Sequence, residues 1–262
     1  MLFRSTFDCE IPQSFVAASL AALEMPDGTW RIVQKETVAV TWVNWDGTVL
    51  ETDENVPYGE VPSYDGDTPV RPATEQYTYT FSGWKPIPLK VVKDATFTAQ
   101  YDREENTYEV TLLYDSANVS VTISPEADGG KYAYGAEVTI AVEAGENTTL
   151  RGITANGEEM KAGEDGTYLA EVTGSLEVII SSMVLEGDDR VICGETAEYT
   201  ASCFPETEGS VTWTSSDTEK AVILDGVLTG IRAGLTWVTC EAADGTSVSR
   251  AVQVLYKDVT ST

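Results

Sequence analysis

The sequence predicts an all-β protein with minor α structure, built from small β domains in tandem. Apolar and aromatic residues alternate with polar ones over many short stretches, such as 77–81 and 97–101, and a period of two is typical of a strand with one buried face. Turn-forming Gly, Asp and Asn residues separate these stretches. A length of 262 residues, 42% of them hydrophobic, is enough for about two to four small domains with packed cores.

Residues 1–37 form the first expected unit, a docking segment with a short helix. The run 15–23 is apolar and rich in Ala, and a helix there would place several apolar residues on one face. This face could dock on another protein or pack on the chain's own first domain, and the sequence leaves both alternatives open. The candidate docking residues are Phe15, Val16, Leu20 and Leu23.

The same apolar run has the length of a secretory signal core. A signal peptide needs a positively charged leader, whereas Asp8 and Glu10 here outnumber the single Arg4. We therefore expect no signal peptide. A turn at Asp27-Gly28 then leads into a strand predicted at 30–33.

Residues 38–104 form the second expected unit. A strand–turn–strand pattern surrounds Asp46-Gly47, and two further strands are predicted where aromatic residues alternate with Thr and Gln. The unit resembles the Listeria–Bacteroides repeat, also called the internalin B-type repeat, which implies a small β-grasp-like domain of surface proteins with a helical turn near 72–76. The resemblance is carried by Asn44-Trp45-Asp46-Gly47-Thr48, Tyr58-Gly59, Pro72, Tyr79, Phe81, Gly83-Trp84, Ala95, Phe97, Ala99 and Tyr101.

Residues 105–183 look like a divergent copy of this unit. Three stretches alternate with period two, around Val110, Val121 and Ile140. Tyr134-Gly135 corresponds to Tyr58-Gly59, but Ile153 stands where the first copy has Trp84. We expect a second β-grasp-like domain that ends at a short joint, Met183–Asp189.

Residues 184–262 form the last expected unit, a β-sandwich. Four short strands are predicted between 211 and 241, and Asp225-Gly226 is a hairpin signal between two of them. The unit resembles the bacterial immunoglobulin-like group 2 domain, which implies an immunoglobulin-like sandwich for display, without catalytic residues. The matching residues are Trp213, Ser215, Ser216, Ala221, Val222, Gly226, Val227, Gly230, Ala233, Gly234 and Val238.

The chain has four cysteines, Cys9, Cys193, Cys203 and Cys240. Cys203 and Cys240 are placed on strands that face each other across the expected sandwich, where immunoglobulin domains often carry a disulfide. A free thiol is also a good small core residue. A disulfide and a pair of core thiols stay open as alternatives, and none of the four cysteines has metal-ligand spacing.

The composition limits the chemistry. The chain contains no histidine, which excludes Ser-His-Asp and Cys-His catalysis and histidine-based metal sites. Tyr64-Asp65-Gly66-Asp67 has too few oxygen ligands for a calcium loop, and Trp84 is expected in the core instead of a sugar-binding site. We expect no catalytic residue, cofactor or metal.

The formal net charge of −27 repels phosphate backbones and anionic lipids, so neither nucleic acid nor membrane is an expected partner. The sequence favours a non-catalytic display protein on a bacteriophage virion, a head decoration or fibre, that binds a capsid or tail protein through residues 1–37. A host-surface glycan or protein would be the target of the displayed domains, and a homo-oligomer is left open. The alternative is a secreted bacterial cell-surface adhesin or a fragment of one.

Overall fold

The computed structural model describes residues 20–34, 36–206 and 209–257. These residues contain strands and turns but no helix, which confirms the all-β class and corrects the expected minor α structure. No helix that could cross a membrane occurs among them. The chain divides into two compact units, Met1–Glu105 and Asn106–Thr262.

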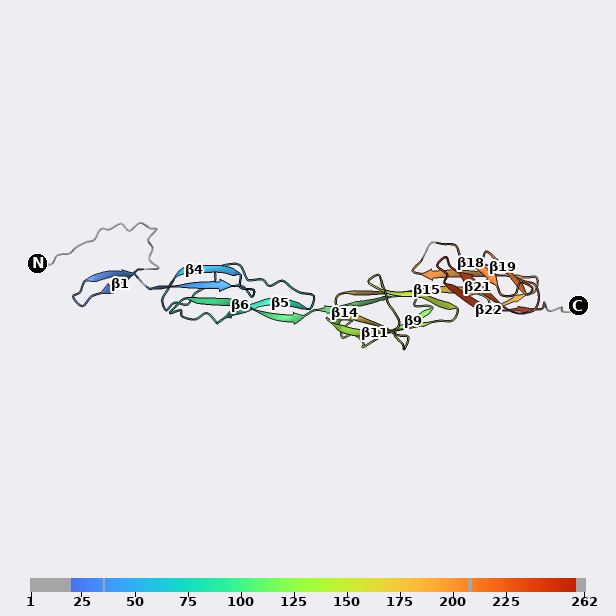
Figure 1. The fold of residues 1–262 in the computed structure, drawn as a ribbon, viewed down its shortest axis with the longest axis horizontal. Coiled ribbons are helices and arrows are strands. Elements are labelled where there is room, and N and C mark those ends of the chain that lie inside the picture. Colours follow the sequence, from blue (N-terminus) through green and yellow to red (C-terminus); the bar gives the residue numbers. More distant parts are fainter. Residues whose placement is uncertain (1–19, 35, 207–208, 258–262) are drawn as a thin grey trace. The chain divides into compact units, whose positions relative to one another are not determined.

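The first described element is a hairpin of its own (Figure 1). β1 (Leu20–Glu24) pairs antiparallel with β2 (Trp30–Gln34), and neither strand pairs with another strand of the described chain. The helix expected over 15–23 is therefore wrong at its C-terminal end. The Ala- and Leu-rich run has high helix propensity, but the turn at Asp27-Gly28 brings a strand-forming partner within reach, and pairing overrides so weak a preference.

A mixed sheet forms the rest of the first unit, in the order β4-β3-β6-β5. The outer pairs β3–β4 and β5–β6 are antiparallel hairpins, whereas the central strands β3 and β6 are parallel. The helical turn expected near 72–76 is absent, since the chain crosses there as irregular structure. The strands are β3 (Thr37–Val43), β4 (Val49–Pro57), β5 (Tyr77–Lys85) and β6 (Ala95–Glu105).

Aromatic rings fill the core of this sheet. Trp42 is buried, its ring centroid lies 4.8 Å from Phe97 and 4.7 Å from Trp84, and its indole Nε1 donates a hydrogen bond to Asp53 Oδ2 at 2.9 Å. Tyr64 closes the cluster from the β4–β5 crossover, 4.9 Å from Trp84. Trp84 thus packs against the core, as the sequence predicts.

The second unit begins with two sheets that share a core. One sheet has the order β14-β11-β9; in the other, β15 lies between antiparallel β12 and parallel β8, and β13 pairs with β12. Side chains from both sheets, including Ile140 and Ile180, meet in one buried cluster. The strands are β7 (Thr107–Tyr108), β8 (Val110–Leu113), β9 (Val119–Ser124), β10 (Tyr132–Ala133), β11 (Ala136–Ala144), β12 (Thr148–Ala155), β13 (Glu158–Glu159), β14 (Tyr168–Val172) and β15 (Leu176–Gly187).

This region keeps part of the strand plan of 38–104. In both, a strand near the start of the region runs parallel to the last strand, β3 with β6 and β8 with β15, and an antiparallel strand flanks the last one. The difference is the three-stranded second sheet, which the first unit lacks among its described residues. The shared strand alternation in the sequence does not distinguish one sheet from two.

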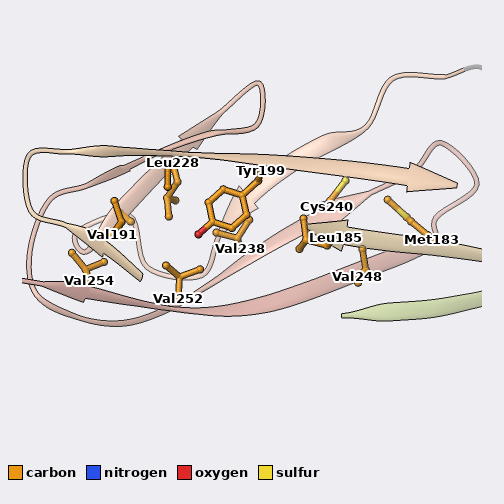
Figure 2. Close-up of a cluster of buried hydrophobic side chains, with 12 residues drawn as sticks. Met183, Leu185, Val191, Tyr199, Leu228, Val238, Cys240, Val248, Val252 and Val254 are labelled. Carbon is orange, nitrogen blue, oxygen red and sulfur yellow. The ribbon is translucent and has the colours of Figure 1, made fainter. Parts of the chain in front are cut away.

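A second pair of sheets completes the unit. One sheet continues from β15 in the order β15-β17-β20-β19, and the other has the order β16-β22-β21-β18. Apolar side chains of both sheets form one buried cluster, shown in Figure 2. The strands are β16 (Arg190–Ile192), β17 (Thr196–Phe204), β18 (Thr212–Ser215), β19 (Ala221–Leu224), β20 (Val227–Gly230), β21 (Gly234–Glu241) and β22 (Ser247–Leu255).

Turn chemistry fixes the register of these strands. Asp225 and Gly226 both have positive φ, 48° and 82°, as the predicted hairpin turn requires, and β19 pairs with β20 on either side of them. A Cβ at Gly226 would lie 2.6 Å from the carbonyl oxygen of Tyr199, so glycine is also needed for space. The predicted hairpin is therefore present with its expected residues.

Strand β15 joins the two sandwiches and replaces the joint expected at Met183–Asp189. Its residues 182–184 pair with β12 on one edge and with β17 on the other. All of 182–185 are buried, because sheet neighbours on both edges and side-chain layers on both faces exclude water there. The expected boundary at 183/184 therefore lies inside a central strand.

Candidate functional site

The candidate docking residues separate into two groups. Phe15 and Val16 lie outside the described residues. Leu20 and Leu23 lie in strand β1, with backbone partners Gln34 and Arg31. The single helical face expected for Val16, Leu20 and Leu23 is therefore not present over Leu20 and Leu23.

The cysteine pair lies in the core of the second sandwich. Cys240 in β21 is fully buried and Cys203 in β17 is half-buried, and both belong to the same apolar cluster as Trp213, the strand partner of Cys240. Figure 2 shows Cys240 among the buried valines and leucines. Cys203, Cys240 and Cys193 are free thiols, and Cys9 lies outside the described residues. Of the two alternatives that the sequence leaves open, the structure has the pair of core thiols.

Because the Cys240 thiol and the Tyr199 hydroxyl lie in this core, we expect the second unit to lose stability at alkaline pH. Burial raises the pKa of Cys240 from 9.0 to about 11, with a further contribution from nearby Cys203, and burial raises the pKa of Tyr199 from 10.0 to about 12. Both groups are neutral when protonated and hold the proton more tightly in the folded state. Their contribution to stability is therefore complete below pH 9 and is lost as the pH rises towards 12. We expect the urea midpoint of the second unit to fall over this range.

Denaturation of the wild type and of Cys240→Ala at pH 8, 9.5 and 10.5 would test this. The variant should be less stable than the wild type at pH 8, because the substitution leaves a small cavity. Its stability should nevertheless fall less than that of the wild type between pH 8 and pH 10.5. An equal pH dependence of both proteins would contradict the role of the buried thiol.

A pocket of about 420 Å³ lies next to Cys203, lined also by Arg151, Glu206 and Asp244. Arg151 Nε and Nη2 donate to Asp244 Oδ2 at 3.1 and 2.5 Å, which ties strand β12 to the β21–β22 turn. Hydrogen bonds from Thr246 and Arg151 lower the pKa of Asp244 to about 2. The chain has no histidine to act as a base on the thiol, so the pocket lacks the nucleophile–base pair of a Cys enzyme.

The shifted carboxyl groups have turn geometry rather than catalytic geometry. Every carboxyl group of the described residues with a shifted pKa has it lowered, whereas a general acid needs a raised value. The cause in most of them is an Asp-Gly-Thr turn, in which the Asp side chain accepts a hydrogen bond from the Thr backbone two residues later. The carboxyl groups concerned are Asp27, Asp46, Asp165, Asp217 and Asp244.

The acidic turn at Tyr64–Asp67 is closed by protein groups. Glu51 Oε2 accepts hydrogen bonds from the backbone N–H of Asp65 and Gly66, each at 3.0 Å, and the Tyr64 hydroxyl donates to the carbonyl of Asp67 at 3.0 Å. No group of three or more Cys, Asp or Glu side chains suited to a metal occurs in the described part of the chain.

An arginine holds the β4–β5 crossover against the sheet. The Arg71 guanidinium lies 4.5 Å from the Trp45 ring centroid and 3.8 Å from that of Tyr79, within the range of cation–π attraction. These aromatic faces are covered by the protein's own cation, so the cluster anchors a loop.

Sequence reasoning missed a surface in the first unit that is neither core nor turn. The loop 85–93, which is the last residue of β5 and most of the β5–β6 connection, exposes Ile87, Leu89 and Val92 beside three lysines. A signal was present in the sequence, because this stretch has three lysines and no acid in a chain of 16 basic and 43 acidic residues.

Comparisons with known proteins add no family. A scan of protein-family models gave no match to the chain, and a search of curated proteins gave none either. The function therefore has to be inferred from the chain's own residues.

Proposed function

We propose that the chain is a non-catalytic display protein of a bacteriophage virion, a head decoration or fibre, with its β domains presented for weak adhesion to a host-surface glycan or protein. Many copies on a particle would make individually weak contacts effective by avidity. The observation that carries the proposal is that the aromatic and acidic residues described above stabilise the fold itself. Trp42, Trp84 and Tyr199 fill the interiors of the sheets, and the aspartates with a lowered pKa close turns. 

The sheet order of the last sandwich supports a display module. β15-β17-β20-β19 against β16-β22-β21-β18 follows the order of the immunoglobulin sandwich, in which strands A, B, E and D face C, F and G. Cys203 and Cys240 lie on the strands that correspond to B and F. We infer that residues 184–262 are an immunoglobulin-like domain, in line with the resemblance in the sequence.

The hairpin β1–β2 supports a docking role for residues 1–37. A two-stranded sheet is marginally stable by itself in water, and these two strands pair only with each other in the described chain. A partner protein of the particle would provide the missing surface. The alternative function is a secreted bacterial adhesin, for which the partner would be a component of the cell surface.

Truncation tests the docking role. We expect a chain lacking residues 1–37 to be absent from particles assembled in its presence, and a chain that ends at Glu105, the end of the first compact unit, to be incorporated at the normal copy number. Quantitative mass spectrometry of purified particles measures both. Retention of the first truncation at full copy number would refute docking through this segment.

A further inference from the structure

The β5–β6 connection of the first unit is an ordered, exposed apolar loop. Ile87 and Leu89 have exposed fractions of 75% and 69%, and Val92 is exposed as well. Val91 is buried and fixes the loop through two backbone hydrogen bonds, Val91 N–H to the Glu60 carbonyl at 2.9 Å and Gly59 N–H to the Val91 carbonyl at 2.7 Å. Apolar side chains held outward in this way are typical of a protein–protein contact.

The charge of the loop is opposite to that of the chain. Lys85 ends β5, Lys90 and Lys93 lie in the connection, and none of the three has a carboxylate within 4.0 Å among the described residues. Asp94, the last residue before β6, accepts a hydrogen bond from the Ala39 N–H at 2.8 Å. The whole chain has a net charge of −27. The surface complementary to this loop is therefore an acidic protein surface that also exposes apolar side chains.

The same unit has such a surface beside the edge strand β4. A shallow, open groove of about 520 Å³ runs between residues 52–57 and the segment 60–65. Val56 and Val61 contribute apolar side chains, and the acidic residues of its wall are Asp53, Glu54, Glu60 and Asp65. The backbone carbonyl of Glu60 accepts a hydrogen bond from the Val91 N–H, so the groove begins next to the basic loop.

We propose that a second copy of the chain occupies this surface, with the loop 85–93 of each copy in the groove of the other. A basic apolar loop beside an acidic groove is self-complementary under two-fold rotation, which is the requirement for a closed dimer. Direct pairing of two β4 edges would instead oppose acid to acid, because Glu51, Asp53 and Glu54 line this strand. The proposal stands independently of particle docking.

Ionic strength decides whether the local attraction prevails. Two copies of net charge −27 repel each other at long range, but the Debye length is about 8 Å at physiological salt, so distant charges are screened while contacting charges still interact. We expect dimers at about 0.15 M salt and weaker association when salt is lowered, since repulsion then extends further.

Sedimentation of the full chain under reducing conditions tests the apolar part. The wild type should show a monomer–dimer equilibrium, and the double variant Ile87→Ser/Leu89→Ser should raise the dissociation constant roughly tenfold or more. Leu224→Ser is the matched control, because Leu224 is also 75% exposed but lies in the second unit. A monomeric wild type at all concentrations, or an equal effect of the control, would overturn the proposal.

A charge exchange tests the electrostatic part. Lys90→Glu/Lys93→Glu and Glu54→Lys/Glu60→Lys/Asp65→Lys should each be monomeric alone, because the loop and the groove of one variant then carry net charges of the same sign. In a mixture of equal amounts, both contacts regain opposite charges, so dimers should return. If the mixture stays monomeric while each variant keeps the wild-type circular dichroism spectrum, loop and groove do not meet.

Discussion

Replacing Trp42 by Ala should lower the free energy of unfolding of the first unit by about 3–5 kcal/mol, as for other large aromatic residues removed from a core. Trp42 is almost completely buried and contacts Tyr64, Trp84 and Phe97. Its loss also leaves Asp53 Oδ2 without the indole donor. The remaining rings come from different strands and from a crossover, so none of them can refill the cavity without moving the backbone.

Hydrogen exchange measured strand by strand separates this unit from the rest of the full chain. Amides of β3 and β6 should lose protection in the variant, and those of β17 and β21 should not. Trp45→Ala is the control, because Trp45 is 46% exposed and contacts Arg71 rather than the core; its cost should be about 1 kcal/mol. Similar losses for Trp42 and Trp45 would show that the aromatic cluster is not the core of the sheet.

The sequence predicted those strands best whose turns are local. β19, β20 and β21 were expected close to their observed positions, because Asp225-Gly226 and Ala233-Gly234 allow few backbone conformations. The inward positions Tyr199, Ala201 and Cys203 of β17 follow from alternation alone. In these segments the local preference and the fold agree.

The elements that were missed depend on distant partners. β1 carries a helix-forming composition, and its strand conformation comes from pairing with β2. The sequence places a joint inside β15, because Gly187-Asp188-Asp189 is a flexible, charged segment. The partners of β15 that override this local signal, β12 and β17, lie on either side of it in the sequence. The exposure of the apolar residues in the loop 85–93 depends on how the loop folds back on Glu60 through Val91, and a short apolar run in the sequence does not distinguish an exposed loop from a buried one.

Strand β15 belongs to both sandwiches, so a break in it should affect both. Ser182→Pro should destabilise the second unit by about 3 kcal/mol or more, because proline removes a donor and cannot fit a central strand. Ser182 is fully buried and pairs with Leu150 of β12 and with Phe204 of β17. One substitution should therefore weaken both sandwiches together.

Two variants isolate the backbone effect. The Ser182 hydroxyl is buried without a hydrogen-bond partner, so Ser182→Ala should be neutral or slightly stabilising, which separates the loss of the side chain from the loss of the donor. Ser210→Pro, in an exposed segment outside the strands, should change the stability by less than about 1 kcal/mol. Urea unfolding followed by hydrogen exchange would then show β9 and β11 losing protection together with β21 and β22 in Ser182→Pro. If only one of the two sandwiches responded, β15 would be a passive connection, and residues 105–183 and 184–262 would fold as separate domains, as the sequence suggested.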